Sequence, residues 1–71
     1  MHIFDELKNS EIQHLIDEHI HSQRDREIMK YKLVDNRTAE WIADKFDMNF
    51  RTVQRIIARN KKMLSKVYKK P

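Results

Sequence analysis

Apolar residues recur along this chain at the spacing of a helix, in four separate blocks. Within each block they lie three and four residues apart, which places them on one face of a helix. The pattern predicts helices over about residues 11–20, 23–34, 39–46 and 50–68. The sequence contains no glycine and only one proline, at its last position. We therefore expect a nearly all-helical chain with short connections.

Residues that commonly cap helices stand before each predicted helix. Ser10 and Gln13 match a capping box for the first helix, because each side chain can bond the backbone of the other residue. Ser22 stands at the start of the second helix, and Thr38 and Asn49 can cap the third and the fourth. These positions define the helix starts more closely than the apolar pattern does.

The third and fourth predicted helices are joined by a tight turn at residues 47–49, which is the layout of a helix-turn-helix. Their inward positions are Ile42, Ala43, Phe46, Val53, Ile56 and Ile57. Ala43 is small where the following helix must cross closely. The predicted fold is therefore all-α: a compact four-helix domain of residues 1–71, with a C-terminal helix-turn-helix at about residues 38–62 and a basic extension at 61–71. Helix pairs of this kind also occur as purely structural units.

Side chains on the outward face of the fourth helix are of the types that read DNA bases. Arg51 and Arg55 lie one turn apart, and either can bond the O6 and N7 atoms of a guanine. Gln54 suits adenine, whereas Thr52 suits a phosphate or a thymine methyl group. Phe50 opens the helix and either packs on the turn or contacts a thymine methyl group. These five residues are the candidate base contacts, and a solvated side chain is the alternative for each.

The positive charge of the chain is concentrated at its C-terminal end. Residues 1–22 carry five acids and one lysine, residues 23–48 carry six groups of each sign, and residues 49–71 carry eight basic groups and no acid. This predicts a polyanionic partner, although blocks of like charge are also often simply solvated. The candidate phosphate contacts, which would position the domain on double-stranded DNA, are Arg37, Thr38, Lys45, Asn49, Arg59, Lys61 and Lys62. Asn60 interrupts the apolar face of the fourth helix, and we expect the core to end near it.

Two features of the sequence carry a family resemblance. One is the stretch Asp25-Arg-Glu-Ile-Met-Lys-Tyr-Lys-Leu-Val34 followed by a short connection, and the other is the set of apolar positions Ile42, Ala43, Val53, Ile56, Ala58 and Leu64. With them the chain resembles region four of bacterial sigma factors over about residues 10–67. The resemblance implies a sequence-specific regulator of transcription, of phage or bacterial type, whose recognition helix (residues 50–62) lies in the major groove. It also implies base contacts by Phe50, Arg51, Gln54 and Arg55.

Four positions depart from the pattern of that family. It often has glycine in the loop before the helix-turn-helix and within its turn, where this chain has Asn36 and Asp47. Asparagine and aspartate tolerate a left-handed backbone better than other non-glycine residues, but at a cost. Arg51 stands where the family frequently has an acid, so a DNA target cannot be carried over. Trp41 stands where the family usually has an exposed polar residue.

Trp41 has two alternative roles. It can pack across the first or the second helix, where burial of its large side chain is favourable. Alternatively, it can form a protein interface together with Ile3, Phe4 and Leu7. The partner would then be a second copy of the chain, since such DNA readers commonly form homodimers, or RNA polymerase or another regulator. A protein-interaction module that docks on RNA polymerase or another regulator through the first helix and Trp41 is accordingly the second class of function that the sequence supports.

Other classes of function find little support in the residues. His14, Asp17, Glu18 and His21 share one helix face, but nothing fixes a zinc geometry there, and a polar outer face explains them. Without glycine there is no glycine-rich phosphate loop, and no nucleophile–base pair stands out. We expect no enzymatic activity, no metal and no cofactor. No apolar run approaches the about 20 residues of a membrane span, no secretion signal is recognisable and cysteine is absent, so we expect a cytoplasmic protein without membrane contact.

Overall fold

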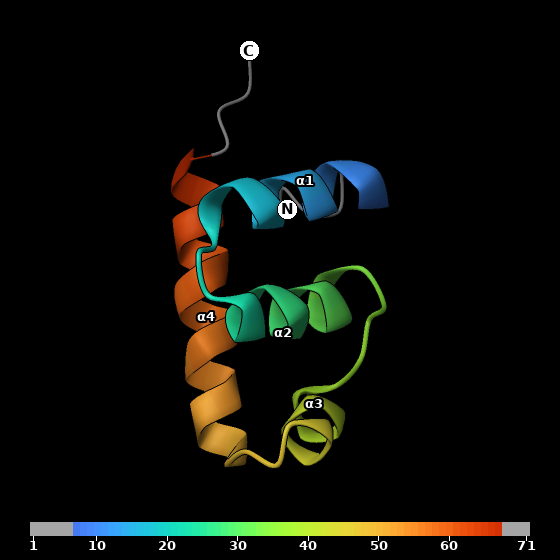
Figure 1. The fold of residues 1–71 in the computed structure, drawn as a ribbon, viewed down its shortest axis with the longest axis vertical. Helices are drawn as coiled ribbons and strands as arrows, with labels where there is room; N and C mark the ends of the chain where they lie inside the picture. Colours follow the sequence, from blue (N-terminus) through green and yellow to red (C-terminus); the bar gives the residue numbers. More distant parts are fainter. Residues whose placement is uncertain (1–6, 68–71) are drawn as a thin grey trace.

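A computed structural model of the chain describes residues 7–67 and shows four helices and no strand in that range (Figure 1). The helices are α1 (Asn9–His19), α2 (Gln23–Leu33), α3 (Ala39–Lys45) and α4 (Phe50–Val67). Every boundary that falls within the described residues lies within two residues of the predicted one. The structure therefore confirms the all-α fold and the number of helices.

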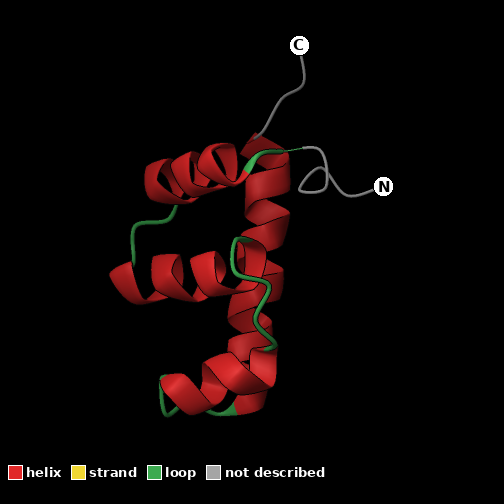
Figure 2. Ribbon diagram, turned by 90° about the vertical axis from the view of Figure 1, so that its right-hand side faces the viewer, coloured by secondary structure: helices red, strands yellow, loops and turns green. Residues whose placement is uncertain are grey.

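The three short helices lie along one side of α4, with α2 between α1 and α3. Figure 1 shows them following one another along the length of α4, and Figure 2 shows the same order after a quarter turn. Each of the three contacts α4, and α2 also contacts both of its neighbours. The longest helix is therefore the common surface against which the others pack.

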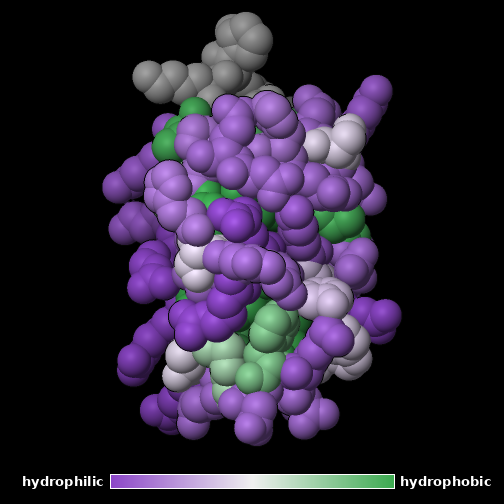
Figure 3. Space-filling model, in the orientation of Figure 1, coloured by the Kyte–Doolittle hydropathy of each residue, from purple (hydrophilic) through white to green (hydrophobic). Residues whose placement is uncertain are grey.

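A single core, built mostly of isoleucine, lies between α4 and the short helices. Its buried residues are Ile12, Ile16, Ile20, Ile28, Met29, Ile42, Ala43, Val53, Ile56, Ile57 and Leu64. The outer surface is mainly hydrophilic on the face that Figure 3 shows. These residues fall on the helix faces that the apolar spacing predicts.

The core does not end near Asn60, so this prediction is wrong. Leu64, one turn further along α4, is fully buried, because α1 covers this part of the helix (Figure 1). Asn60 is itself 7% exposed, and its side-chain amide donates to the carbonyl oxygen of Ile56 at 2.9 Å. A buried amide that forms such a bond costs far less than an unpaired one, and the apolar face can continue past it.

The caps predicted for α3 and α4 are confirmed, and Ser22 caps α2 in the same way. Ser22, Thr38 and Asn49 each accept a hydrogen bond from a backbone amide in the first turn of the following helix, at 3.3, 3.0 and 2.8 Å. Each bond satisfies an amide that has no partner within the helix. The starts of α2, α3 and α4 are therefore fixed by local sequence.

The predicted cap of α1 is wrong. The helix begins before Ser10, at Asn9, and Lys8 takes the capping position. The carboxylate of Glu11 accepts from the backbone amide of Lys8 at 3.0 Å. This bond from the third helical residue forms half of a capping box and does not need a serine.

Two connections place a non-glycine residue in the left-handed region of the backbone. Asn36 follows α2 with φ 58°, and Asp47 follows α3 with φ 53°. Just beyond Asp47, the amide of Met48 donates to the carbonyl oxygen of Ala43 at 2.8 Å, which closes the end of α3. Glycine is the usual residue at such a position because it has no Cβ. The expected left-handed backbone at both sites is confirmed.

Replacing Asp47 by glycine is expected to raise the melting temperature. The steric cost of the left-handed backbone disappears, whereas the unfolded chain gains some entropy. The net gain is about 0.5–1 kcal/mol, which corresponds to roughly 2–8 °C for a domain of this size. Thermal unfolding followed by circular dichroism measures this change.

Asp35→Gly is the matched control for this substitution. Asp35 lies in the other connection, and its φ is not positive. Glycine there adds only freedom to the unfolded chain, so the melting temperature should fall. A fall for Asp47→Gly as well would show that the left-handed backbone at that turn carries no cost.

Candidate nucleic-acid interface

The candidate base contacts all lie on the surface, in the first turns of α4. Arg51, Thr52, Gln54 and Arg55 are exposed, and Phe50 is 41% exposed. The buried positions Val53, Ile56 and Ile57 hold the opposite side of the same turns against the core. The exposed side chains therefore project from a part of the helix that is fixed by packing.

We call the exposed side of this helix the outward face of α4. It consists of Arg51, Thr52, Gln54, Arg55, Ala58, Lys62 and Lys66. Across its whole length α4 carries six basic residues and no acid. The outward face is therefore a positively charged strip opposite an apolar one.

The start of α4 differs electrostatically from the starts of the other helices. The first turns of α1, α2 and α3 contain Glu11, Asp25 and Glu40, whereas the first turn of α4 has no acid and contains Arg51. A helix has a partial positive charge at its N-terminus, so a basic residue there is unfavourable by about 0.3–1 kcal/mol. An anion bound at this end would be attracted to both the helix end and Arg51, which would offset that cost.

The candidate phosphate contacts lie before and in α3, in the turn that follows it, and along α4. Arg37, Thr38, Lys45, Asn49 and Lys62 are exposed. Arg37 and Thr38 precede α3, whose first residue lines the same surface groove as Gln54. Part of the phosphate set and part of the base-contact set therefore lie side by side. Lys61 lines that groove too and is half-buried.

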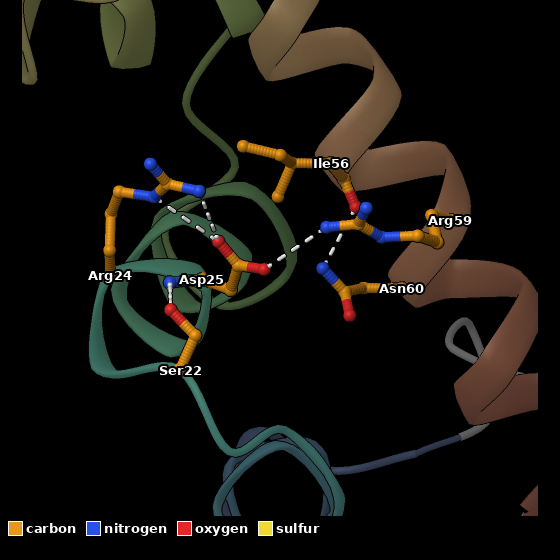
Figure 4. Close-up of polar contacts among 6 residues, drawn as sticks. All are labelled: Ser22, Arg24, Asp25, Ile56, Arg59 and Asn60. Atoms are coloured by element: carbon orange, nitrogen blue, oxygen red, sulfur yellow. Dashed lines mark hydrogen bonds and ion pairs between the residues drawn. The ribbon is translucent and has the colours of Figure 1, made fainter.

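Arg59 has a partner that the sequence did not reveal (Figure 4). Its Nη2 atom donates to Oδ2 of Asp25 at 3.3 Å, and Arg24 donates to the other carboxylate oxygen at the same distance. Asp25 is only 7% exposed, and its own backbone amide donates to the hydroxyl of Ser22. The guanidinium of Arg59 therefore ties α4 to the start of α2. Its side chain remains 69% exposed, so its other donors still face solvent.

Trp41 packs against α2 and leaves one part of its ring exposed. Its ring centroid lies 5.1 Å from that of Tyr31, and 37% of the residue is exposed. Arg37 lies over the same ring at 4.6 Å and Lys45 at 5.7 Å, both within the range of cation–π attraction. Two phosphate candidates thus converge on the ring of Trp41.

The residues proposed with Trp41 as a protein interface are not brought together with it in the described part of the chain. Leu7 packs on the core at the start of α1, and α2 lies between α1 and α3 (Figure 1). Ile3 and Phe4 lie outside the described residues. Trp41 therefore forms a surface with Arg37 and Lys45 that is separate from Leu7.

The helix face with histidines and acids forms two separate contacts rather than a cluster. His14 pairs with Glu18 one turn away, and Asp17 pairs with Lys30 of α2 at 2.9 Å. Across residues 7–67, no three side chains of histidine, aspartate or glutamate lie close enough to share a metal ion. In the same range, no helix has both the length and the apolar character to cross a membrane.

Comparison with protein-family models, curated proteins and solved structures gives no match to this chain.

Removing the carboxylate of Asp25 is expected to destabilise the fold. Asp25→Ala leaves two guanidinium groups unpaired and removes an acid from the positive end of α2, which should cost about 1–2 kcal/mol. In a double-mutant cycle with Arg59→Ala, we expect a coupling of about 0.5–1 kcal/mol, because Arg59 is largely solvent-exposed. Urea unfolding of the four proteins measures both quantities.

Asp17→Ala is the control for the loss of an acid. Asp17 also pairs with a basic residue of α2, but its side chain is 54% exposed. Its loss should cost less than about 0.5 kcal/mol. If Asp25 and Arg59 show no coupling, the two residues do not interact in solution.

Proposed function

We propose that this protein binds double-stranded DNA in a sequence-specific manner and regulates transcription, with α3 and α4 acting as a helix-turn-helix. The observation that carries the proposal is the division of α4 into two faces. One face contributes Val53, Ile56, Ile57 and Leu64 to the core, and the other is positively charged and contains no acid. An α-helix with its side chains is about as wide as the major groove, at roughly 10–12 Å.

The side chains at the start of α4 favour base contacts over a purely electrostatic surface. Arg51, Gln54 and Arg55 are exposed within two turns, and all three can form paired hydrogen bonds with a purine edge. Lysine cannot form such paired bonds in the same planar arrangement. The arginines and the glutamine lie at the start of the helix, and lysine predominates further along it. This order matches a helix whose N-terminal residues reach the bases.

A purely structural helix pair explains these features less well. Such a pair would have no reason to place Arg51 at the positive end of α4 without an acid nearby. The proposed DNA phosphates supply the missing negative charge. The resemblance to sigma region four supports the same use of α3 and α4, with contact to RNA polymerase as part of the regulatory role.

Replacing Arg55 is expected to weaken binding and relax specificity at one base pair. Arg55→Ala should cost about 1–3 kcal/mol on a duplex selected from a random pool, and less on random duplexes. Lys62→Ala should weaken both kinds of duplex alike, because a phosphate contact carries no sequence information. Fluorescence anisotropy over a range of salt concentrations measures both effects. The wild-type log–log salt slope should be about −4 to −7, with about 0.9 for each neutralised phosphate.

Lys8→Ala is the control for loss of one positive charge. Lys8 is exposed at the start of α1, which is the end of that helix furthest from α4 in Figure 1. Its replacement should leave the affinity nearly unchanged at physiological salt, where charges beyond about 8 Å are screened. Equal losses for Arg55→Ala on selected and random duplexes would remove the base-reading role of Arg55.

The alternative function is a protein-interaction module, and the exposed ring of Trp41 is the observation that favours it. An exposed tryptophan between two basic residues is a suitable contact for an acidic partner such as another regulator, RNA polymerase or a second copy of the chain. Amide shifts during titration with DNA distinguish the two functions. We expect the changes at residues 50–62. If DNA causes none there and a protein partner shifts Trp41 instead, the alternative is correct.

A further inference from the structure

A groove opens on the surface where the end of α2 and the start of α3 approach the middle of α4. It has a volume of about 370 Å³ and is lined by Lys32, Ala39, Gln54, Ile57, Ala58 and Lys61. Three helices thus contribute to one concave site. Gln54 belongs to the outward face of α4, so the groove is continuous with the candidate DNA surface.

The groove has a small apolar floor and a basic rim. Ala39, Ile57 and Ala58 are short or largely buried, and no acid is among the lining residues. Lys32 and Lys61 are both half-buried, so their aliphatic chains lie along the protein while their charged ends reach solvent. Among residues 7–67, neither lysine forms an ion pair. Two positive charges without a protein partner therefore border an open groove that is large enough to admit a phosphate group.

We propose that this groove binds a backbone phosphate of the DNA strand that borders the major groove occupied by α4. Lys32 and Lys61 neutralise the phosphate from two sides, and the amide of Gln54 lies between this phosphate and the bases. The inference rests on the proposed function and deepens it. It assigns α2, which otherwise serves the core, a direct contact with DNA.

The position of the groove favours a DNA phosphate over an isolated anion. Thr38, a candidate phosphate contact, immediately precedes Ala39 of the groove lining. Arg37 precedes Thr38, so two candidate phosphate contacts directly precede a groove residue along the chain. A row of such groups follows a strand backbone, whereas a free anion needs only one compact site. The phosphate bound in the groove would also fix how far α4 enters the major groove.

The test compares two lysines of the same helix. Lys32→Gln removes a groove lysine, and Lys30→Gln removes a half-buried lysine that pairs with Asp17 of α1 outside the groove. Both substitutions remove one positive charge from α2. Binding to a selected duplex and to a random duplex of equal length is measured by fluorescence anisotropy between about 50 and 300 mM salt. In this range of salt concentration, the loss of affinity with added salt reports the number of phosphate contacts. Thermal unfolding of each variant confirms that it is folded.

Lys32→Gln should weaken binding to both duplexes by a similar factor, roughly threefold to tenfold, and should reduce the salt slope by about 0.9. The double variant with Lys61→Gln should reduce the slope by about 1.8. Lys30→Gln should leave the slope unchanged. Equal effects of Lys30→Gln and Lys32→Gln would overturn the groove assignment, since net charge would then explain both.

The failure of this inference can be told apart from failure of the proposed function. If Lys32→Gln binds like the wild type while Arg55→Ala binds more weakly, the groove holds no phosphate and the DNA-binding function stands. If the wild-type protein binds no duplex even at low salt, both proposals are wrong.

Discussion

The apolar face of α4 is the constraint on which the rest of this structure depends. The other helices have 7 to 11 residues, and isolated helices shorter than about 12–15 residues are marginal in water. Each of them is therefore stabilised by packing, and each packs on α4. The shortest helix, α3, contributes two buried residues to this packing, Ile42 and Ala43. Residues 7–67 form one hydrophobic core, so within this range a helix that loses its contact with α4 has no second core to pack on.

The same arrangement determines which way the charged side of α4 faces. A helix packed by one strip can still rotate slightly, and polar contacts at its edges limit that freedom. Asp25 holds Arg59 on one edge of α4, and the groove with Lys32 lies at the other end of α2. Through Asp25, α2 therefore helps to set the orientation of the outward face of α4. Through Lys32, it also places a basic group beside that face.

The sequence predicted the features that depend on neighbouring residues. The helix bounds and the caps Thr38 and Asn49 follow from local chemistry, and the left-handed backbone at Asn36 and Asp47 follows from the family resemblance. The structure confirms both caps and both left-handed positions, and within residues 7–67 it places each helix bound within two residues of the predicted one. It did not predict the pairing of Asp25 with Arg59, because these residues are 34 positions apart. The sequence nevertheless contains a sign that Asp25 contacts another helix. Asp25 and Lys32 lie three residues before and four residues after the buried Ile28, so both occupy the apolar face of α2. Polar residues at such positions indicate a contact with another element.

The two-faced character of α4 also links ligand binding to the folding equilibrium. Unfolding of any short helix releases part of the surface that holds α4 in place, so the outward face exists as an ordered surface only while the core is intact. A ligand that binds only this folded surface raises the free energy of unfolding by about 2.7 kcal/mol when present at one hundred times its Kd. For a small domain with a total stability on the order of 5 kcal/mol, that is a large fraction. Bound and free copies of the protein would therefore differ markedly in their resistance to proteolysis.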